Sequence, residues 1–221
     1  RSSSLANAVS GAGHGMLAMD INAHGIPNGK PPAFYADLGR GELADYRHRG
    51  RESRETIYFR GMYLRLIRAI DFLTSQPEWN GKTLAVVGHS QGGGQALAAG
   101  GLDDRVTFIG TGVPAICDHS GKVIGRINGW PKLVPDGADG KPVPEILEAA
   151  RYVDGVNMAS RVTAEAIMSV GFIDGTCPAT TCYAAYNQLK GKKRVLNEPL
   201  MGHAAPAHIQ EAFMQAGLKH V

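Results

Sequence analysis

The stretch that decides the fold is TLAVVGHSQGG at residues 83–93. Residues 83–88 are mostly apolar and β-branched, which is typical of a buried strand. A sharp glycine-rich corner around Ser90 follows, and small residues then favour a helix over 91–99, which glycines 100–101 are expected to close. This order of strand, tight turn and helix predicts that Ser90 lies at the C-terminal edge of a sheet.

The rest of the chain repeats the same alternation. Further strand signals lie at 106–110, 166–173 and, more weakly, 194–196, and helical patterns lie at 53–76, 181–189 and 206–218. Strands that alternate with helices of this length predict an α/β fold with a mostly parallel sheet and helices on both faces. A length of 221 residues fits a single domain over 1–221.

Two other segments depart from this regular alternation. The apolar run at 16–21 reads as a further buried strand, and a loop rich in Gly, Pro and Asn follows it to about Arg51. Residues 118–144 carry many Gly and Pro residues without a clear period. They are expected to form an inserted loop or a small cap over the sheet.

The composition favours a soluble globular protein. Hydrophobic residues make up 43% and charged residues 19%, and the net charge of +3 is dispersed apart from a basic cluster at 191–194. The sequence therefore predicts no nucleic-acid partner. No apolar window is long enough to span a membrane, and no signal-peptide core follows the first residues. Compartment and oligomeric state stay open, a homo-oligomer included.

The candidate nucleophile is Ser90. Residues 88–92 match G-x-S-x-G between a predicted strand and a predicted helix, the context in which this motif presents a serine hydroxyl. The backbone N–H of Gln91, at the start of the helix, would then face a developing oxyanion. The alternative is an ordinary strand-to-helix turn in which Ser90 only caps the helix.

A serine hydroxyl needs a histidine base and a carboxylate that orients it, and in this fold the chain order is Ser, acid, His. Asp174 ends the apolar run 166–173 and is the best acid, although Asp-Gly is also a common turn. Asp154 is the fallback. His203 lies between the last strand and the last helix, where the base is expected; the alternative is a histidine that merely helps to start that helix.

No metal site and no cofactor are predicted. The remaining histidines show no ligand spacing such as H-E-x-x-H. Cys117, Cys177 and Cys182 are too few for a disulfide framework and form no paired CxxC pattern. Reduced core thiols are expected, while a pairing of Cys177 with Cys182 stays open.

Several segments together resemble acetyl xylan esterases and cephalosporin-C deacetylases of the α/β-hydrolase superfamily. They are GHSQGG at 88–93, VPAICD at 113–118, YVDGVN at 152–157, SVGFID at 169–174, and the stretch from CP at 177–178 to AAYN at 184–187. The resemblance implies an α/β-hydrolase core, a triad of Ser90, Asp174 and His203, the Gln91 N–H in the oxyanion hole, and deacetylation of acetylated sugars.

The sequence departs from that family in three places. Residues 22–25 read Asn-Ala-His-Gly where the family has Arg-Gly-Gln-Gly, and Ala204 stands where a Glu often follows the histidine. The family's first strands, with the loop that gives the second oxyanion N–H, would lie before Arg1. We therefore expect a divergent branch that lacks the N-terminal part of the family fold.

The expected function is a serine esterase that hydrolyses short-chain acyl esters through an acyl-enzyme intermediate, with a small-molecule or carbohydrate ester as substrate. One alternative is a broad short-chain carboxylesterase, which shares the triad and differs in the pocket. Another is a non-catalytic, hydrolase-like binding module. The ordered set of Ser90, Asp174 and His203 argues against the binding module, which has no need of it.

Overall fold

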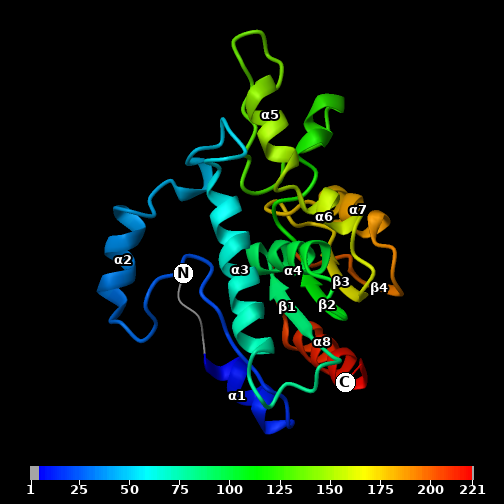
Figure 1. Ribbon diagram of the computed structural model, residues 1–221. Helices are drawn as coiled ribbons and strands as arrows, with labels where there is room; N and C mark the ends of the chain where they lie inside the picture. Colours follow the sequence, from blue (N-terminus) through cyan, green and yellow to red (C-terminus); the bar gives the residue numbers. More distant parts are fainter. Residues whose placement is uncertain (1–4, 221) are drawn as a thin grey trace.

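The computed structural model describes residues 5–220, and a four-stranded parallel sheet lies at its centre (Figure 1). The strands are β1 (Ala85–His89), β2 (Phe108–Gly112), β3 (Glu165–Gly171) and β4 (Lys193–Glu198). Their spatial order is β1-β2-β3-β4, and each neighbouring pair is parallel. Parallel neighbours need crossover connections, and helices lie between successive strands of this chain. The predicted α/β architecture is therefore confirmed.

Helices cover both faces of the sheet. One face carries α4 (Gln91–Leu102), α6 (Gly155–Ala159) and α7 (Ala179–Gln188), while α8 (Ala207–His220) packs on the other face against β2 and β3 (Figure 1). Under α8, a small apolar cluster joins Phe108 and Ile167 of the sheet to Ile209 and Phe213 of the helix. No helix in the described part of the chain is long and apolar enough to cross a membrane.

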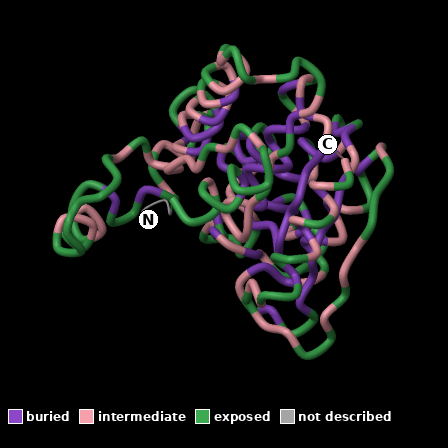
Figure 2. Tube along the Cα trace, turned by 90° about the horizontal axis from the view of Figure 1, so that it is seen from below, coloured by how far each residue is buried: buried purple, intermediate pink, exposed green. Residues whose placement is uncertain are grey.

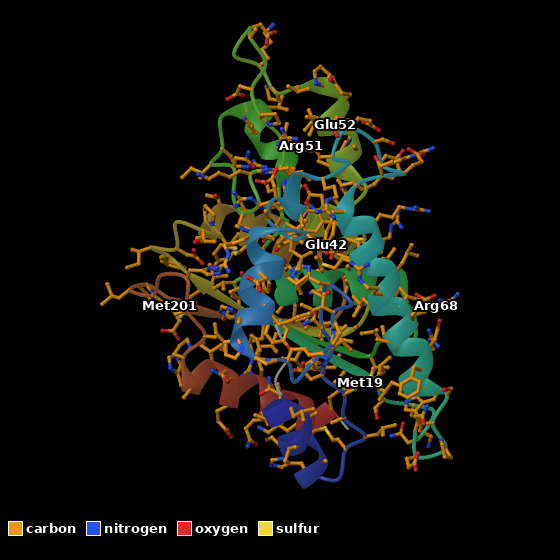
Figure 3. All side chains as sticks on the ribbon, turned by 90° about the vertical axis from the view of Figure 1, so that its left-hand side faces the viewer. Met19, Glu42, Arg51, Glu52, Arg68 and Met201 are labelled. Atoms are coloured by element: carbon orange, nitrogen blue, oxygen red, sulfur yellow. The ribbon has the colours of Figure 1, made fainter. Side chains whose placement is uncertain are left out.

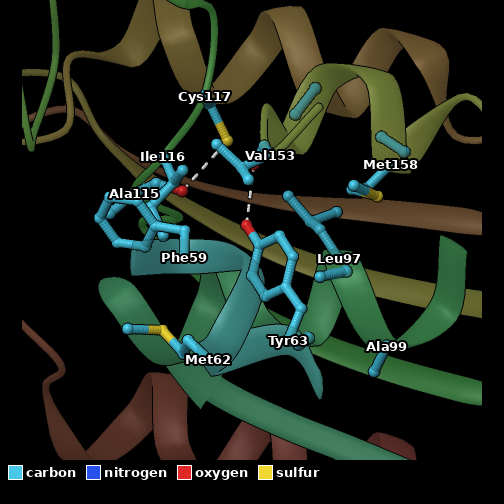
Figure 4. Packing of buried hydrophobic residues seen from close by; sticks show 14 of the residues in the cluster. Phe59, Met62, Tyr63, Leu97, Ala99, Ala115, Ile116, Cys117, Val153 and Met158 are labelled. Atoms are coloured by element: carbon cyan, nitrogen blue, oxygen red, sulfur yellow. Dashed lines mark hydrogen bonds between the residues drawn. The ribbon is translucent and has the colours of Figure 1, made fainter. Parts of the chain in front are cut away.

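The main core lies between the sheet and α3 (Tyr58–Thr74), which packs against α4. Phe59, Met62 and Tyr63 are buried on one face of α3, as the apolar spacing predicts. Figure 4 shows these side chains next to Leu97, with the Tyr63 hydroxyl donating to the Val153 carbonyl at 2.8 Å. Buried segments are concentrated around the sheet, and the projecting arms are mostly exposed (Figure 2).

The glycines at 100–101 do not end α4, which continues to Leu102. They serve close packing instead. A Cβ on Gly101 would lie 2.5 Å from the carbonyl oxygen of Met158 in α6, and one on Gly100 would meet Ile109 and Val162 at 3.2–3.3 Å. Burial of the glycines against neighbouring elements therefore outweighs their weak helix propensity.

The expected strand at 16–21 is not formed. This segment follows α1 (Leu5–Gly13) and pairs with no strand among the described residues. Leu17 and Met19 are 39% and 37% exposed; Met19 is labelled in Figure 3. A strand needs a hydrogen-bonded neighbour, and residues 16–21 have none among the described residues. They do not pair with β1, which stays one of the two edge strands of the sheet, with Val87 55% exposed.

Two segments read as loops contain helices. Residues 22–51 include α2 (Pro32–Arg40), which has proline at its N-terminus, and the 3₁₀-helix η1 (Tyr46–His48). The predicted insertion at 118–144 includes the 3₁₀-helix η2 (His119–Ile124) and leads into α5 (Pro144–Arg151). Together η2 and α5 form the arm that projects at the top of Figure 1.

Candidate active site

Ser90 lies on a strained corner between β1 and α4. Its φ of 57° is in a region that L residues rarely adopt. Backbone hydrogen bonds tie the corner to the segment after β2: the Ser90 N–H donates to Gly112 O at 2.8 Å, and the Ala115 N–H donates to Ser90 O at 3.0 Å. A Cβ at Gly88 would collide with the backbone of Gly92, so the corner needs glycine there.

His203 links the other two predicted residues. Its Nε2 lies 2.8 Å from Oγ of Ser90, and its Nδ1 lies 2.8 Å from Oδ2 of Asp174. The Asp174 side chain is fully buried, whereas that of His203 is 27% exposed. A carboxylate can only accept at Nδ1, so the Nδ1–H tautomer is favoured and Nε2 is left to accept the serine proton.

The loop after β3 fixes the carboxylate of Asp174. Its Oδ1 accepts hydrogen bonds from the backbone N–H groups of Thr176 at 2.7 Å and Cys177 at 2.9 Å. Asp174 can therefore serve both as a turn residue and as the acid of the triad, because each role uses a different carboxylate oxygen. With both oxygens engaged, the carboxylate holds the imidazole of His203 in one orientation.

Asp154, the fallback acid, does not take part in this site. Its Oδ1 accepts from the N–H groups of Asp118 and Val156, both at 2.9 Å, and its Oδ2 accepts from the N–H of His119 at 2.7 Å. Asp154 thus caps α6 and ties it to the start of η2. Its burial is explained by three backbone hydrogen bonds.

The loop that carries His203 runs from β4 to α8 and is supported by His89. The Nε2 of His89 lies 2.7 Å from the carbonyl of Ala204, and the two imidazole rings are 5.5 Å apart. Burial is the main cause that lowers the pKa of His89, so its ring is neutral at neutral pH. His89 therefore supports the loop that carries His203.

The surroundings of Gln91 include a contact that the sequence does not reveal. As the first residue of α4, Gln91 has an N–H without a partner inside the helix. Its side-chain Oε1 accepts a hydrogen bond from the Tyr46 hydroxyl at 2.6 Å. A cavity of about 370 Å³ is lined by Ile21, Asn22, Ala23, His24, Tyr46, His89, Gln91, Gly92 and Gln95.

All three cysteines are free and buried, as expected. The possible ligand atoms of Asp174, Cys177 and His203 lie within 4.8 Å of one another. Burial raises the pKa of the Cys177 thiol, which disfavours the thiolate that a metal requires, and Asp174 and His203 already bond to each other. Asp174 and His203 are therefore better suited to their hydrogen bond with each other than to metal binding.

Comparison with known families identifies the relatives of this site. The family described as acetyl xylan esterase (AXE1) matches residues 3–217, almost the whole chain. The chain belongs to the acetyl xylan esterase family. This family consists of carboxylic ester hydrolases with the α/β-hydrolase fold, so the resemblance seen in the sequence is confirmed.

Three similar proteins illustrate the likeness. Acetyl esterase Axe7A of Xylanibacter ruminicola is 33% identical over 198 residues, which cover 87% of this chain and 44% of the relative. The solved acetyl xylan esterase from Paenibacillus sp. R4 is 30% identical, with a TM-score of 0.73 over 94% of this chain and 63% of that one. Acetyl Xylan Esterase 1 from Thermoanaerobacterium sp. JW/SL YS485 shares the fold, with 22% identity and a TM-score of 0.63 over 93% of this chain and 63% of that one.

The chain thus spans less than two thirds of the length of these acetyl xylan esterases, and under half of Axe7A.

Proposed function

We propose that this chain hydrolyses short acyl esters, above all the acetyl esters of sugars, through an acyl-enzyme intermediate on Ser90. The observation that carries the proposal is the hydrogen-bonded series Asp174, His203 and Ser90 on a strained corner. Its support is twofold: this geometry is that of a serine hydrolase triad, and the chain belongs to the acetyl xylan esterase family.

In this mechanism the Ser90 oxygen attacks the ester carbonyl carbon while Nε2 of His203 takes the hydroxyl proton. The N–H of Gln91 stabilises the negative oxygen of the tetrahedral intermediate. His203 then gives its proton to the departing alcohol, which leaves an acetyl group on Ser90. A water molecule, deprotonated by the same imidazole, releases acetate and restores the serine. Asp174 keeps the imidazole in the required tautomer throughout.

The decisive experiment is Ser90→Ala. We expect nearly all hydrolysis of p-nitrophenyl acetate to disappear while the circular dichroism spectrum and the melting temperature stay close to those of the wild type. The change opens no core cavity, which is why the fold is retained. A fluorophosphonate probe should label the wild type and not the variant. Turnover retained in folded Ser90→Ala would refute the serine mechanism, and an unlabelled, inactive wild type would favour the binding module.

The broad carboxylesterase remains the competing proposal, and one feature favours the acetyl esterase. The segment after β2 lies directly beside the Ser90 corner, is fully packed, and has positive φ at Val113 (34°) and Ile116 (61°). Such a rigid wall leaves little room for longer acyl chains. Each methylene of the acyl chain that this wall excludes should lower kcat/KM on the order of tenfold.

An acyl series separates these two proposals. We expect kcat/KM to fall from p-nitrophenyl acetate to butyrate to octanoate, together with activity on an acetylated xylo-oligosaccharide. A maximum at octanoate would discard the acetyl esterase proposal. Good butyrate turnover without activity on the acetylated sugar would favour the general carboxylesterase.

A further inference from the structure

A residue of the N-terminal arm holds the side chain next to the nucleophile. Tyr46 in η1 is 45 positions before Gln91, and its hydroxyl donates to Oε1 of Gln91 at 2.6 Å. Tyr46 is only 9% exposed. Both residues line the 370 Å³ cavity that adjoins the Ser90 corner. Tyr46 thus connects the N-terminal arm directly to the first residue of α4.

The ring of Tyr46 is itself held in place. It packs edge-to-face on His24, with the ring centroids 4.6 Å apart, and lies 5.0 Å from the ring of Tyr58. Nδ1 of His24 in turn lies 2.8 Å from the Tyr58 hydroxyl. The guanidinium groups of Arg49 and Arg65 lie 5.9 and 5.7 Å from the centre of the Tyr58 ring. The hydroxyl of Tyr46 therefore has a well-defined position.

This hydrogen bond determines which way the amide of Gln91 points. A side-chain amide carries an acceptor oxygen and a donor nitrogen. When Oε1 accepts the hydrogen bond from the Tyr46 hydroxyl, Nε2 points away from Tyr46. Nε2 of Gln91 has no hydrogen-bond partner among residues 5–220. Its two protons are therefore available to a ligand. One helical turn later, Gln95 also faces the cavity, and its buried Oε1 likewise has no partner.

We propose that Tyr46 is a positioning residue for ester hydrolysis, which fixes the Gln91 amide so that Nε2 and the backbone N–H both face a bound ester. This proposal rests on the proposed function. Without the Tyr46 hydroxyl the amide can turn over and present Oε1 instead. A carbonyl oxygen repels the negative charge that develops on the substrate, so the transition state is affected more than substrate binding.

The first test is Tyr46→Phe, with Tyr63→Phe as the matched control. Tyr63 is also buried, and its hydroxyl donates a hydrogen bond to Val153 O at 2.8 Å in the core. For p-nitrophenyl acetate we expect Tyr46→Phe to lower kcat about tenfold or more, with KM changed less than about twofold. Tyr63→Phe should keep the kcat of the wild type. Equal losses in both variants would indicate a merely structural role and overturn the proposal.

The second test is a double-mutant cycle with Gln91→Met, which removes the amide and keeps the backbone N–H. If Tyr46 acts through the Gln91 side chain, the kcat of the double variant equals that of Gln91→Met alone. Losses that multiply would show that Tyr46 acts by another route. Gln91→Met also tests the proposal if Tyr46→Phe fails to fold, because a wild-type kcat in Gln91→Met would overturn it.

The two proposals fail in different ways. If the wild type hydrolyses no ester, the proposed function is wrong and the Tyr46 proposal falls with it. If the wild type is active, loses activity in Ser90→Ala and keeps its kcat in Tyr46→Phe, only the Tyr46 proposal is overturned.

Discussion

The carboxylate of Asp174 and the imidazole of His203 share a single hydrogen bond of 2.8 Å, from Nδ1 to Oδ2, while the other carboxylate oxygen is occupied by the backbone. In Asp174→Asn the remaining side-chain oxygen still accepts the backbone hydrogen bonds, and the new NH₂ group lies against Nδ1 of His203. That group favours the wrong imidazole tautomer, so we expect kcat to fall by about four orders of magnitude while the protein stays folded. Steady-state kinetics with p-nitrophenyl acetate measures this.

Asp154→Asn is the matched control for Asp174→Asn. Asp154 accepts three backbone hydrogen bonds away from the site, so this change should lower the free energy of unfolding by about 1–3 kcal/mol and leave kcat per folded molecule within a few fold. A larger loss of kcat in Asp154→Asn than in Asp174→Asn would mean that the carboxylate has been assigned wrongly.

The rate should depend on a neutral His203. In the proposed mechanism Nε2 of His203, 2.8 Å from the Ser90 hydroxyl, accepts the serine proton, and a protonated imidazole cannot do so. We therefore expect kcat/KM to fall as the solution becomes acidic. Burial lowers the pKa of the neighbouring His89, so its ring stays neutral at neutral pH. A rate that stays constant into strongly acidic solution would contradict a histidine base.

His119 should make the fold sensitive to acid. It is completely buried, and neither ring nitrogen has a hydrogen-bond partner in the described part of the chain. Burial lowers its pKa, although the carboxylates of Asp154 and Asp118 partly oppose this. The unfolded chain, in which a histidine titrates near about 6.5, therefore binds the proton more readily than the folded one. The stability contributed by neutral His119 is present above that pH and is lost as the pH falls toward the folded-state pKa.

The measurement for His119 is urea unfolding at pH 7.5 and pH 5.5. In the wild type we expect the free energy of unfolding to drop by up to about 1.4 kcal/mol per pH unit on account of this residue. His119→Leu should show a smaller drop, whatever its stability at pH 7.5. His208→Gln changes an exposed histidine and serves as the control. The same drop in His119→Leu as in the wild type would rule out His119 as the cause.

The cysteines should resist alkylation in the folded protein. Cys117, Cys177 and Cys182 are buried, and burial raises their pKa values, that of Cys182 to about 12. Thiolate is the reactive form, so iodoacetamide at neutral pH should neither modify nor inactivate the native protein. All three thiols should react in guanidinium chloride. Rapid loss of activity in native buffer would show that a thiol beside the site is accessible.

The sequence predicts most of the site because its signals are local. The corner at Ser90 is defined by glycines within two positions of it, and Asp174 and His203 each follow a strand signal at the same edge of the sheet. The C-terminal ends of parallel strands lie at the same edge of a sheet, whatever the length of the connections between the strands. The placement of all three residues could therefore be anticipated before their distances were known.

Features that depend on distant partners could not be predicted. The apolar run at 16–21 has the composition of a strand but no hydrogen-bonded neighbour in the described chain. Gly100 and Gly101 resemble a helix end until the closeness of Val162 and Met158 is known. The contact of Tyr46 with Gln91 has no sequence signal, since a tyrosine in a polar loop is ordinary. Each case is decided by tertiary packing.

The 113 residues that separate Ser90 from His203 have a consequence for synthesis. Ribosomes add about 5–20 residues per second, so Ser90 is made roughly 6–23 s before His203. During that interval the growing polypeptide carries a serine hydroxyl that nothing deprotonates. On the proposed mechanism, ester hydrolysis would therefore start only after β4 and the loop that follows it have left the ribosome and docked beside β3. A nascent chain stalled before His203 would be inert towards both esters and fluorophosphonates.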